Sequence, residues 1–96
     1  MREYTQQEKN DIVREWLFDE VRTERVRQDK KWGEQNHGDD YWLGIFVEEV
    51  GEIAKAVIER KDDEITTEVI HAIAVLSGWT ECRQRRPSDT LEEVEA

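Results

Sequence analysis

The segment Val69-Ile-His-Ala-Ile-Ala-Val-Leu-Ser-Gly-Trp79 contains no charged side chain unless His71 is protonated. As a helix it would be apolar around nearly its whole circumference, so it needs partners on several sides. Two other helices of a 96-residue chain cannot easily cover it. We therefore expect an all-α fold, an antiparallel helical bundle that is completed by oligomerisation as a dimer or higher assembly.

The rest of the chain also has a helical pattern, because apolar residues recur at steps of three and four and the strand-like period of two is absent. Thr5-Gln-Gln-Glu8 has the pattern of a capping box and predicts a first helix from about residue 6. The apolar stripe of this helix is Ile12, Val13, Trp16, Leu17 and Val21. Residues 22–31 are strongly polar, so the second half of the helix should face solvent or a polar site.

Polar turns mark the limits of the next two helices. Trp32-Gly33 breaks the helical pattern, and residues 34–39 have the glycine and short polar side chains of a loop, after which Asp39 or Asp40 is expected to cap the second helix. That helix should stop near residues 60–61, whose positive charges suit a helix C-terminus.

The third helix is expected to follow a turn and cap at Asp62-Asp63. It should run from about residue 64 to 85 and end before Pro87, because the residue before a proline is pushed out of helical geometry. Residues 87–96 are expected either to add a marginal helical turn or to form a flexible tail. The chain is too short for a second folded unit, so residues 1–96 are interpreted as one helical domain.

Composition narrows the classes of partner and compartment. The formal net charge is −10, which disfavours duplex nucleic acid as a partner because such binding depends on Lys and Arg. The longest uncharged stretch, residues 69–80, is far shorter than the roughly 18 residues that span a bilayer, so no membrane association is expected. A single cysteine, Cys82, fits a reducing compartment, and we expect a cytoplasmic protein.

Carboxylates are grouped on the second and third predicted helices. Glu49 and Glu52 are three residues apart and therefore neighbours on a helix surface, with Glu48 one step around, while Glu68 and His71 repeat the same spacing. Facing carboxylates that are partly buried need a cation, and Mg²⁺ is commonly held by a few carboxylates together with substrate phosphates. Spacing alone leaves open that these glutamates are ordinary exposed helix residues.

Two separated blocks resemble the MazG-like, all-α nucleoside triphosphate pyrophosphohydrolase superfamily. Val47-Glu-Glu-Val-Gly-Glu-Ile-Ala-Lys-Ala56 is similar to the Glu-Glu-x-x-Glu signature of that superfamily, and Glu68-Val-Ile-His71 falls where it has Glu-x-x-Asp. The stretch from Glu24 to Gln35 is similar to the region before the signature in short phage-type (phage or prophage) members. Together the blocks span roughly residues 22–80.

The resemblance implies metal-dependent hydrolysis between the α- and β-phosphates of a (deoxy)nucleoside triphosphate, which releases the monophosphate and pyrophosphate. It implies that Mg²⁺ is held by Glu49, Glu52, Glu68 and His71, and that the chain forms a homodimer or homotetramer. Glu48, together with Glu49, would hold or activate the attacking water. His71 departs from the family pattern: imidazole suits Mn²⁺ better than Mg²⁺, and the site loses one negative charge. A histidine in an apolar helix is also often a satisfied core residue, and both interpretations stay open.

The polar end of the first helix supplies candidate substrate-binding residues. Arg25 and Lys31, beside a metal site, would grip the distal phosphates, and Trp32 would stack on the base. Arg27 and Gln28 belong to the same group. The alternatives are that Trp32 fills the bundle where the helix ends and that the charges form a solvated face.

Three functions are compatible with these features. The first is a pyrophosphohydrolase acting on a nucleoside triphosphate. The second is a catalytically weak or inactive helical scaffold or regulatory module with a residual metal or nucleotide site. The third, suggested only by the net charge, is an acidic mimic of nucleic acid. Saturable metal binding separates the first from the third, and pyrophosphate release separates the first from the second.

Overall fold

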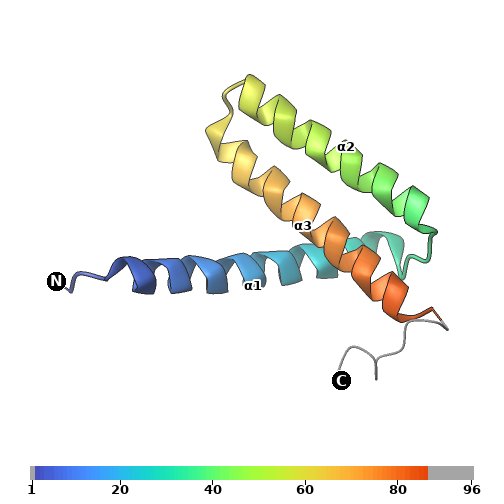
Figure 1. The fold of residues 1–96 in the computed structure, drawn as a ribbon, viewed down its shortest axis with the longest axis horizontal. Helices are drawn as coiled ribbons and strands as arrows, with labels where there is room; N and C mark the ends of the chain where they lie inside the picture. The colour runs from blue at the N-terminus through green and yellow to red at the C-terminus, as the bar shows by residue number, and fades with distance from the viewer. Residues whose placement is uncertain (1, 87–96) are drawn as a thin grey trace.

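Residues 2–86 are described by a computed structural model, and within them the chain is entirely helical. The helices are α1 (Gln6–Trp32), α2 (Asp39–Ile58) and α3 (Asp62–Gln84), and this part of the chain contains no strand (Figure 1). The all-α class predicted from the sequence is confirmed. The expectations for residues 87–96 lie outside the described residues.

Helix α1 begins and ends where its local sequence predicts. The amide of Glu8 donates to Thr5 Oγ1 at 3.1 Å, and the amide of Thr5 donates to Glu8 Oε1 at 3.0 Å, which completes the capping box. The helix ends at Trp32 because Gly33 adopts φ 72°, a left-handed conformation that side chains disfavour. Its amide donates to the carbonyl of Asp29 at 2.8 Å.

The predicted caps of α2 and α3 were wrong by one to two residues. Gly38 is the cap of α2, and Asp39 and Asp40 already lie in the first turn. Lys61 precedes α3, whose first turn contains Asp62-Asp63. An aspartate stabilises a helix N-terminus both as a cap and, through the helix dipole, in the first turn, so composition does not distinguish the two positions.

The three helices form a hairpin with a crossing helix. Helices α2 and α3 run antiparallel side by side, and α1 packs across the C-terminal half of α3 (Figure 1). The N-terminal half of α1 projects beyond the hairpin (Figure 1). Consistent with this, the buried residues of α1 are Glu24 and Gln28, both in its polar second half. One face of that half therefore meets a polar site, and the rest of it faces solvent.

The core lies mainly along α3. Its buried apolar members are Trp42, Ala56, Ile70, Ala72, Ala74, Val75 and Cys82. Small side chains on α3 let its neighbours approach closely: a Cβ atom added to Gly78 would lie 3.2 Å from Cη2 of Trp42. The Trp42 indole therefore fills the space that Gly78 leaves between α2 and α3.

Helix α3 is covered by its own chain more completely than its sequence suggested. Its buried residues contact α2 and α1, and Leu76, at 39%, is its most exposed large apolar side chain. Most of the exposed large apolar side chains of the described residues lie instead on α2 and on the first half of α1. They include Leu43, Val47, Val50, Val57 and Ile58 on α2, and Ile12, Val13, Trp16 and Phe18 on α1. The physical reason to expect a second copy therefore belongs to these two helices. None of the described helices is both long and apolar enough to cross a membrane.

Candidate metal centre

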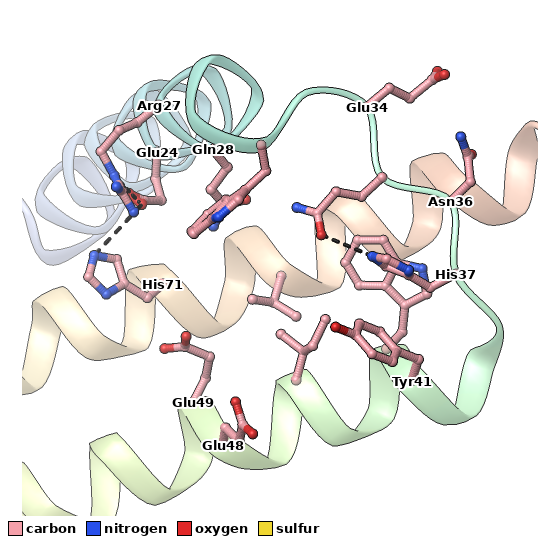
Figure 2. Close-up of a pocket in the computed structure, with 15 residues that line it drawn as sticks. Glu24, Arg27, Gln28, Glu34, Asn36, His37, Tyr41, Glu48, Glu49 and His71 are labelled. Atoms are coloured by element: carbon pink, nitrogen blue, oxygen red, sulfur yellow. Dashed lines mark hydrogen bonds and ion pairs between the residues drawn. The ribbon is translucent and has the colours of Figure 1, made fainter.

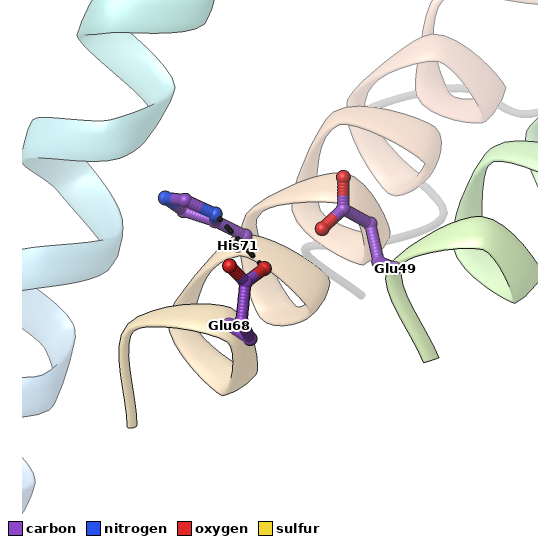
Figure 3. Close-up of side chains that lie close together, drawn as sticks. All are labelled: Glu49, Glu68 and His71. Atoms are coloured by element: carbon purple, nitrogen blue, oxygen red, sulfur yellow. Dashed lines mark ion pairs between the residues drawn. The ribbon is translucent and has the colours of Figure 1, made fainter. Parts of the chain in front are cut away.

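Three potential metal ligands converge between α2 and α3. Glu49 of α2 and Glu68 and His71 of α3 each offer one ligand atom, and these atoms lie within 4.8 Å of one another (Figure 3). All three residues are partly buried. Glu68 and His71 face the same way because they are one helical turn apart, with Nδ1 of His71 3.5 Å from Oε2 of Glu68. Glu49 joins them from the opposite helix of the hairpin.

The three donors fit a hard or borderline divalent ion. Mg²⁺ holds oxygen ligands at about 2.1 Å, so ligands on opposite sides of the ion are about 4.2 Å apart, and the cluster needs only a small contraction. Two carboxylates suit Mg²⁺, and the addition of an imidazole also suits Mn²⁺. Three protein ligands would leave further coordination positions for water and for phosphate oxygens.

The charge on Glu49 is costly in the absence of a cation. Burial raises the pKa of Glu49, and the electrostatic interaction with His71 opposes that shift. The negative charges of Glu68, Glu52 and Glu24 raise the pKa further. A cation bound between these groups would favour the ionised form of Glu49, because it would offset the repulsion between the carboxylates and the cost of burying their charge.

Glu24 of α1 is a further carboxylate at this centre, and no sequence motif assigned it a role. It is 7% exposed, and its Oε2 lies 3.8 Å from Nε2 of His71. Arg27 donates from Nε to Oε1 at 2.5 Å and from Nη2 to Oε2 at 2.8 Å. The hydrogen bond from Arg27 lowers the pKa of Glu24 in spite of its burial, so Glu24 is an anion. One sequence signal pointed here: Glu24 and Gln28, at i and i+4, share a face of a helix whose second half lacks an apolar stripe.

His71 therefore lies between two carboxylates from different helices. Its Nε2 faces Glu24 and its Nδ1 faces Glu68. The His71 side chain is 33% exposed, which differs from a fully packed core histidine. A protonated ring would satisfy both carboxylates, and a neutral ring would leave Nδ1 with a lone pair for an ion beside Glu68.

Two of the predicted glutamates lie at the edge of this cluster. Glu52 is exposed, one turn beyond Glu49, and it is near enough for its charge to raise the pKa of Glu49. It is not among the three residues whose ligand atoms converge. Glu48 is also exposed, and it lines a pocket beside Glu49 (Figure 2).

This pocket has a volume of about 790 Å³ and runs from the ligand cluster to the loop between α1 and α2. At the cluster end it is lined by Glu48, Glu49, His71 and Glu24. Arg27, Gln28 and Trp32 line it from α1, and Gln35, Asn36, His37, Tyr41 and Trp42 line it at the loop end (Figure 2). Of the predicted substrate-binding residues, the structure brings Gln28 and Trp32 to the pocket. Of the loop-end residues, Gln35, Asn36 and His37 were predicted from the sequence only as part of a connecting loop.

Arg25 and Lys31 are placed elsewhere. The Arg25 guanidinium donates from Nε and Nη2 to the two carboxylate oxygens of Glu81, both at 2.9 Å, and so fastens α1 to α3. Lys31 does not line the pocket, and its Nζ lies 4.6 Å from the centre of the Trp32 ring. Arg27 holds the cationic position at the pocket that the sequence suggested for Arg25.

Comparison of the chain with protein-family models, with curated proteins and with solved structures finds no match. Function is therefore inferred from the residues of the chain and from the geometry and chemistry of the pocket.

Proposed function

We propose that the chain is a metal-dependent nucleoside triphosphate pyrophosphohydrolase that converts a (deoxy)nucleoside triphosphate to the monophosphate and pyrophosphate. The observation that carries the proposal is that Glu49, Glu68 and His71 converge at one end of a pocket whose other end carries aromatic and amide side chains. Such a pocket has oxygen and nitrogen ligands for an ion that binds phosphates, and flat surfaces for a base. The resemblance of residues 47–56 and 68–71 to the MazG-like signature supports the same reaction.

The residues of the cluster divide into metal ligands and a residue that activates water. Glu49, Glu68 and His71 would hold Mg²⁺ or Mn²⁺, and Glu52, one turn beyond Glu49, would need a different side-chain rotamer to join them. Glu48, on the pocket wall beside Glu49, orients and deprotonates the attacking water. When bound, the ion would neutralise part of the negative charge of the triphosphate and lower the pKa of a bound water.

Arg27 is the cation placed to meet the phosphates. Its side chain is 53% exposed and lines the pocket while it pairs with Glu24. The guanidinium can exchange part of this pairing for phosphate oxygens, which it binds with the same two-point geometry. Trp32, 54% exposed on the same wall, offers a ring face to the base.

The direct test is pyrophosphate release from a panel of nucleoside triphosphates with Mg²⁺ and then with Mn²⁺. Glu49→Gln should reduce release by at least about a hundredfold, since it removes a charged ligand but keeps the side-chain volume. Glu15→Gln, an exposed change on the projecting half of α1, is the matched control and should leave release unchanged. Absence of pyrophosphate with either ion across the panel would rule out the reaction.

A second candidate function follows from the position of His71 between Glu24 and Glu68. A protonated His71 gives these carboxylates a counter-charge from within the protein, as a helical binding or regulatory module without turnover would require. Such a module would bind a nucleotide or a metal ion without producing pyrophosphate.

We also propose that two or more copies associate through the exposed apolar side chains of α2. Leu43, Val47 and Val50 are each at least 44% exposed and follow the four- and three-residue steps of a helix-packing seam. Sedimentation at micromolar concentration should show no helical monomer, and Val47→Glu should produce one. The free thiol of Cys82 fits a reducing, cytoplasmic setting for this assembly.

A further inference from the structure

The amide side chains at the loop end of the pocket have their oxygens already engaged. Gln28 is 9% exposed, and its Oε1 accepts a hydrogen bond from Arg25 Nη1 at 3.0 Å. An arginine side chain has donors only, so this bond fixes which end of the amide is the oxygen. Arg25 is itself held by both carboxylate oxygens of Glu81. Gln28 therefore turns its Nε2 donors to the pocket, where no hydrogen-bond partner for them exists among residues 2–86 (Figure 2).

The neighbouring amides repeat this arrangement. Oε1 of Gln35 pairs with Nε2 of His37 at 3.1 Å, and Oδ1 of Asn36 accepts from Nε of Arg85 at 3.1 Å. Both residues line the same pocket as Gln28. In each case the amide nitrogen, a donor of two hydrogen bonds, is the group left without a partner within the described chain.

Aromatic rings flank these donors. Trp32 and Tyr41 line the pocket at 54% and 59% exposure. His37 packs against Tyr41 with the ring centres 4.2 Å apart, which supports Tyr41 from one side. Ring faces and unpaired N–H donors together select a flat heterocycle whose edge carries hydrogen-bond acceptors.

We propose that the loop end of the pocket binds the base of the nucleotide and favours bases with a ring carbonyl over bases with an amino group at the same position. The inference rests on the proposed function, which supplies the nucleotide. A carbonyl oxygen accepts from the Nε2 donors of Gln28. An amino group at that position would place donor against donor and leave the buried amide unsatisfied, which is the strongest basis a site has for rejecting an analogue. Uracil is thus preferred to cytosine, and hypoxanthine to adenine.

The test uses matched monophosphates, because binding can be measured without metal and without turnover. The members of each pair, dUMP with dCMP and dIMP with dAMP, differ chiefly by oxygen against NH₂ at one position. Titration followed by tryptophan fluorescence or by calorimetry should show that the carbonyl member binds at least about tenfold more tightly in at least one pair. Equal affinities, a preference for the amino member, or no binding of any of the four at millimolar concentration would overturn the inference.

A charge variant tests the residue assignment. Gln28→Glu keeps the shape and leaves one carboxylate oxygen for Arg25, but it presents an acceptor to the pocket, so the preference within the pairs should disappear or reverse. Gln6→Glu, in the exposed first turn of α1, is the control and should retain the wild-type preference. If Gln28→Glu does not fold, Gln35→Glu makes the same exchange of donor for acceptor on the loop.

The outcomes separate this inference from the proposed reaction. Discrimination between the monophosphates without pyrophosphate release from any triphosphate would support the base preference and reject the reaction. Equal release from dUTP and dCTP, and from dITP and dATP, would support the reaction and reject the base preference.

Discussion

Arg25 and Glu81 form a two-point ion pair that joins α1 to α3, with Nε and Nη2 of the arginine each 2.9 Å from a carboxylate oxygen. The hydrogen bonds raise the pKa of Arg25 and lower that of Glu81, because each charged form stabilises the other. Ser77 donates to the same carboxylate at 3.0 Å. This contact places Gln28, which accepts from Arg25, at the wall of the pocket.

Breaking the Arg25–Glu81 pair should loosen the docking of α1. In a double-mutant cycle of Arg25→Met and Glu81→Gln, monitored by urea unfolding, we expect a coupling free energy of about 0.5–1 kcal/mol, since the glutamate is partly exposed to water. The same cycle on the exposed pair Arg22 and Asp19 is the control and should give a coupling free energy of a few tenths of a kcal/mol at most. Equal coupling in the two cycles would mean that the pair does not hold α1.

Divalent metal should raise the melting temperature of the protein. Glu49 and Glu68 repel each other when no cation lies between them and His71. A metal ion at 100 times its dissociation constant adds about 2.7 kcal/mol to the free energy of unfolding. Glu49→Gln should hold or increase stability in EDTA, because burial raises the pKa of this carboxyl and the charge is removed, and it should lose most of the metal response. Calorimetry with and without Mg²⁺ or Mn²⁺ measures both effects. An identical metal response in Glu49→Gln would exclude Glu49 as a ligand.

His71→Asp should make the protein more dependent on metal. The new carboxylate would face Glu24 and Glu68, the two groups that His71 now separates, so stability in EDTA should fall while stabilisation by Mg²⁺ should grow. Glu24→Gln in the same chain should restore part of the stability in EDTA, because one of the repelling charges is gone. Melting temperatures of the single and double variants decide the matter. A loss of stability that Mg²⁺ does not reduce would show that position 71 does not reach the ion.

Gly78 and Gly51 provide a matched pair of helix glycines. A Cβ at Gly78 would lie 3.2 Å from the Trp42 ring, whereas one at Gly51 meets nothing within 4 Å. Both alanine variants gain helix propensity, but Gly78→Ala must displace an indole that is 4% exposed. We expect Gly78→Ala to be less stable than Gly51→Ala by about 1–3 kcal/mol in denaturant unfolding. Equal stability of the two variants would show that Trp42 can move freely.

Asp39 should make a distinct contribution to acid stability. It accepts from Nε1 of Trp79 at 2.8 Å, from Arg86 at 2.9 Å and from Arg83 at 2.6 Å. These bonds lower the pKa of Asp39 from 3.8 to about 2, so the stability it contributes is present above pH 3.8 and is lost as the pH falls towards about 2. The difference in free energy of unfolding between the wild type and Asp39→Asn, measured from pH 5 to pH 2, should shrink as the pH falls. A constant difference would mean that the carboxylate gains nothing from these partners.

The sequence alone determined the features that depend on neighbours along the chain. The capping box of Thr5 and Glu8, the stop at Gly33 and the pairing of Glu68 with His71 all follow from spacings of three or four residues in a helix. The short range of these interactions makes them readable without knowing how the helices pack. The predicted cap positions of the aspartates at the starts of α2 and α3 were wrong, because a cap and a first-turn residue satisfy the same electrostatic preference.

Tertiary structure decided which of these side chains meet. Glu49 reaches Glu68 only because α2 and α3 pack as a hairpin, and Glu24 reaches His71 only because α1 crosses α3. Arg25 and Arg27 lie two positions apart in a strongly polar segment, and the rotation of α1 about its own axis decides that Arg25 meets Glu81 while Arg27 lines the pocket. Helix periodicity places residues on faces of a helix, but the packing of Trp42 against Gly78 and of α1 on α3 determines what each face meets.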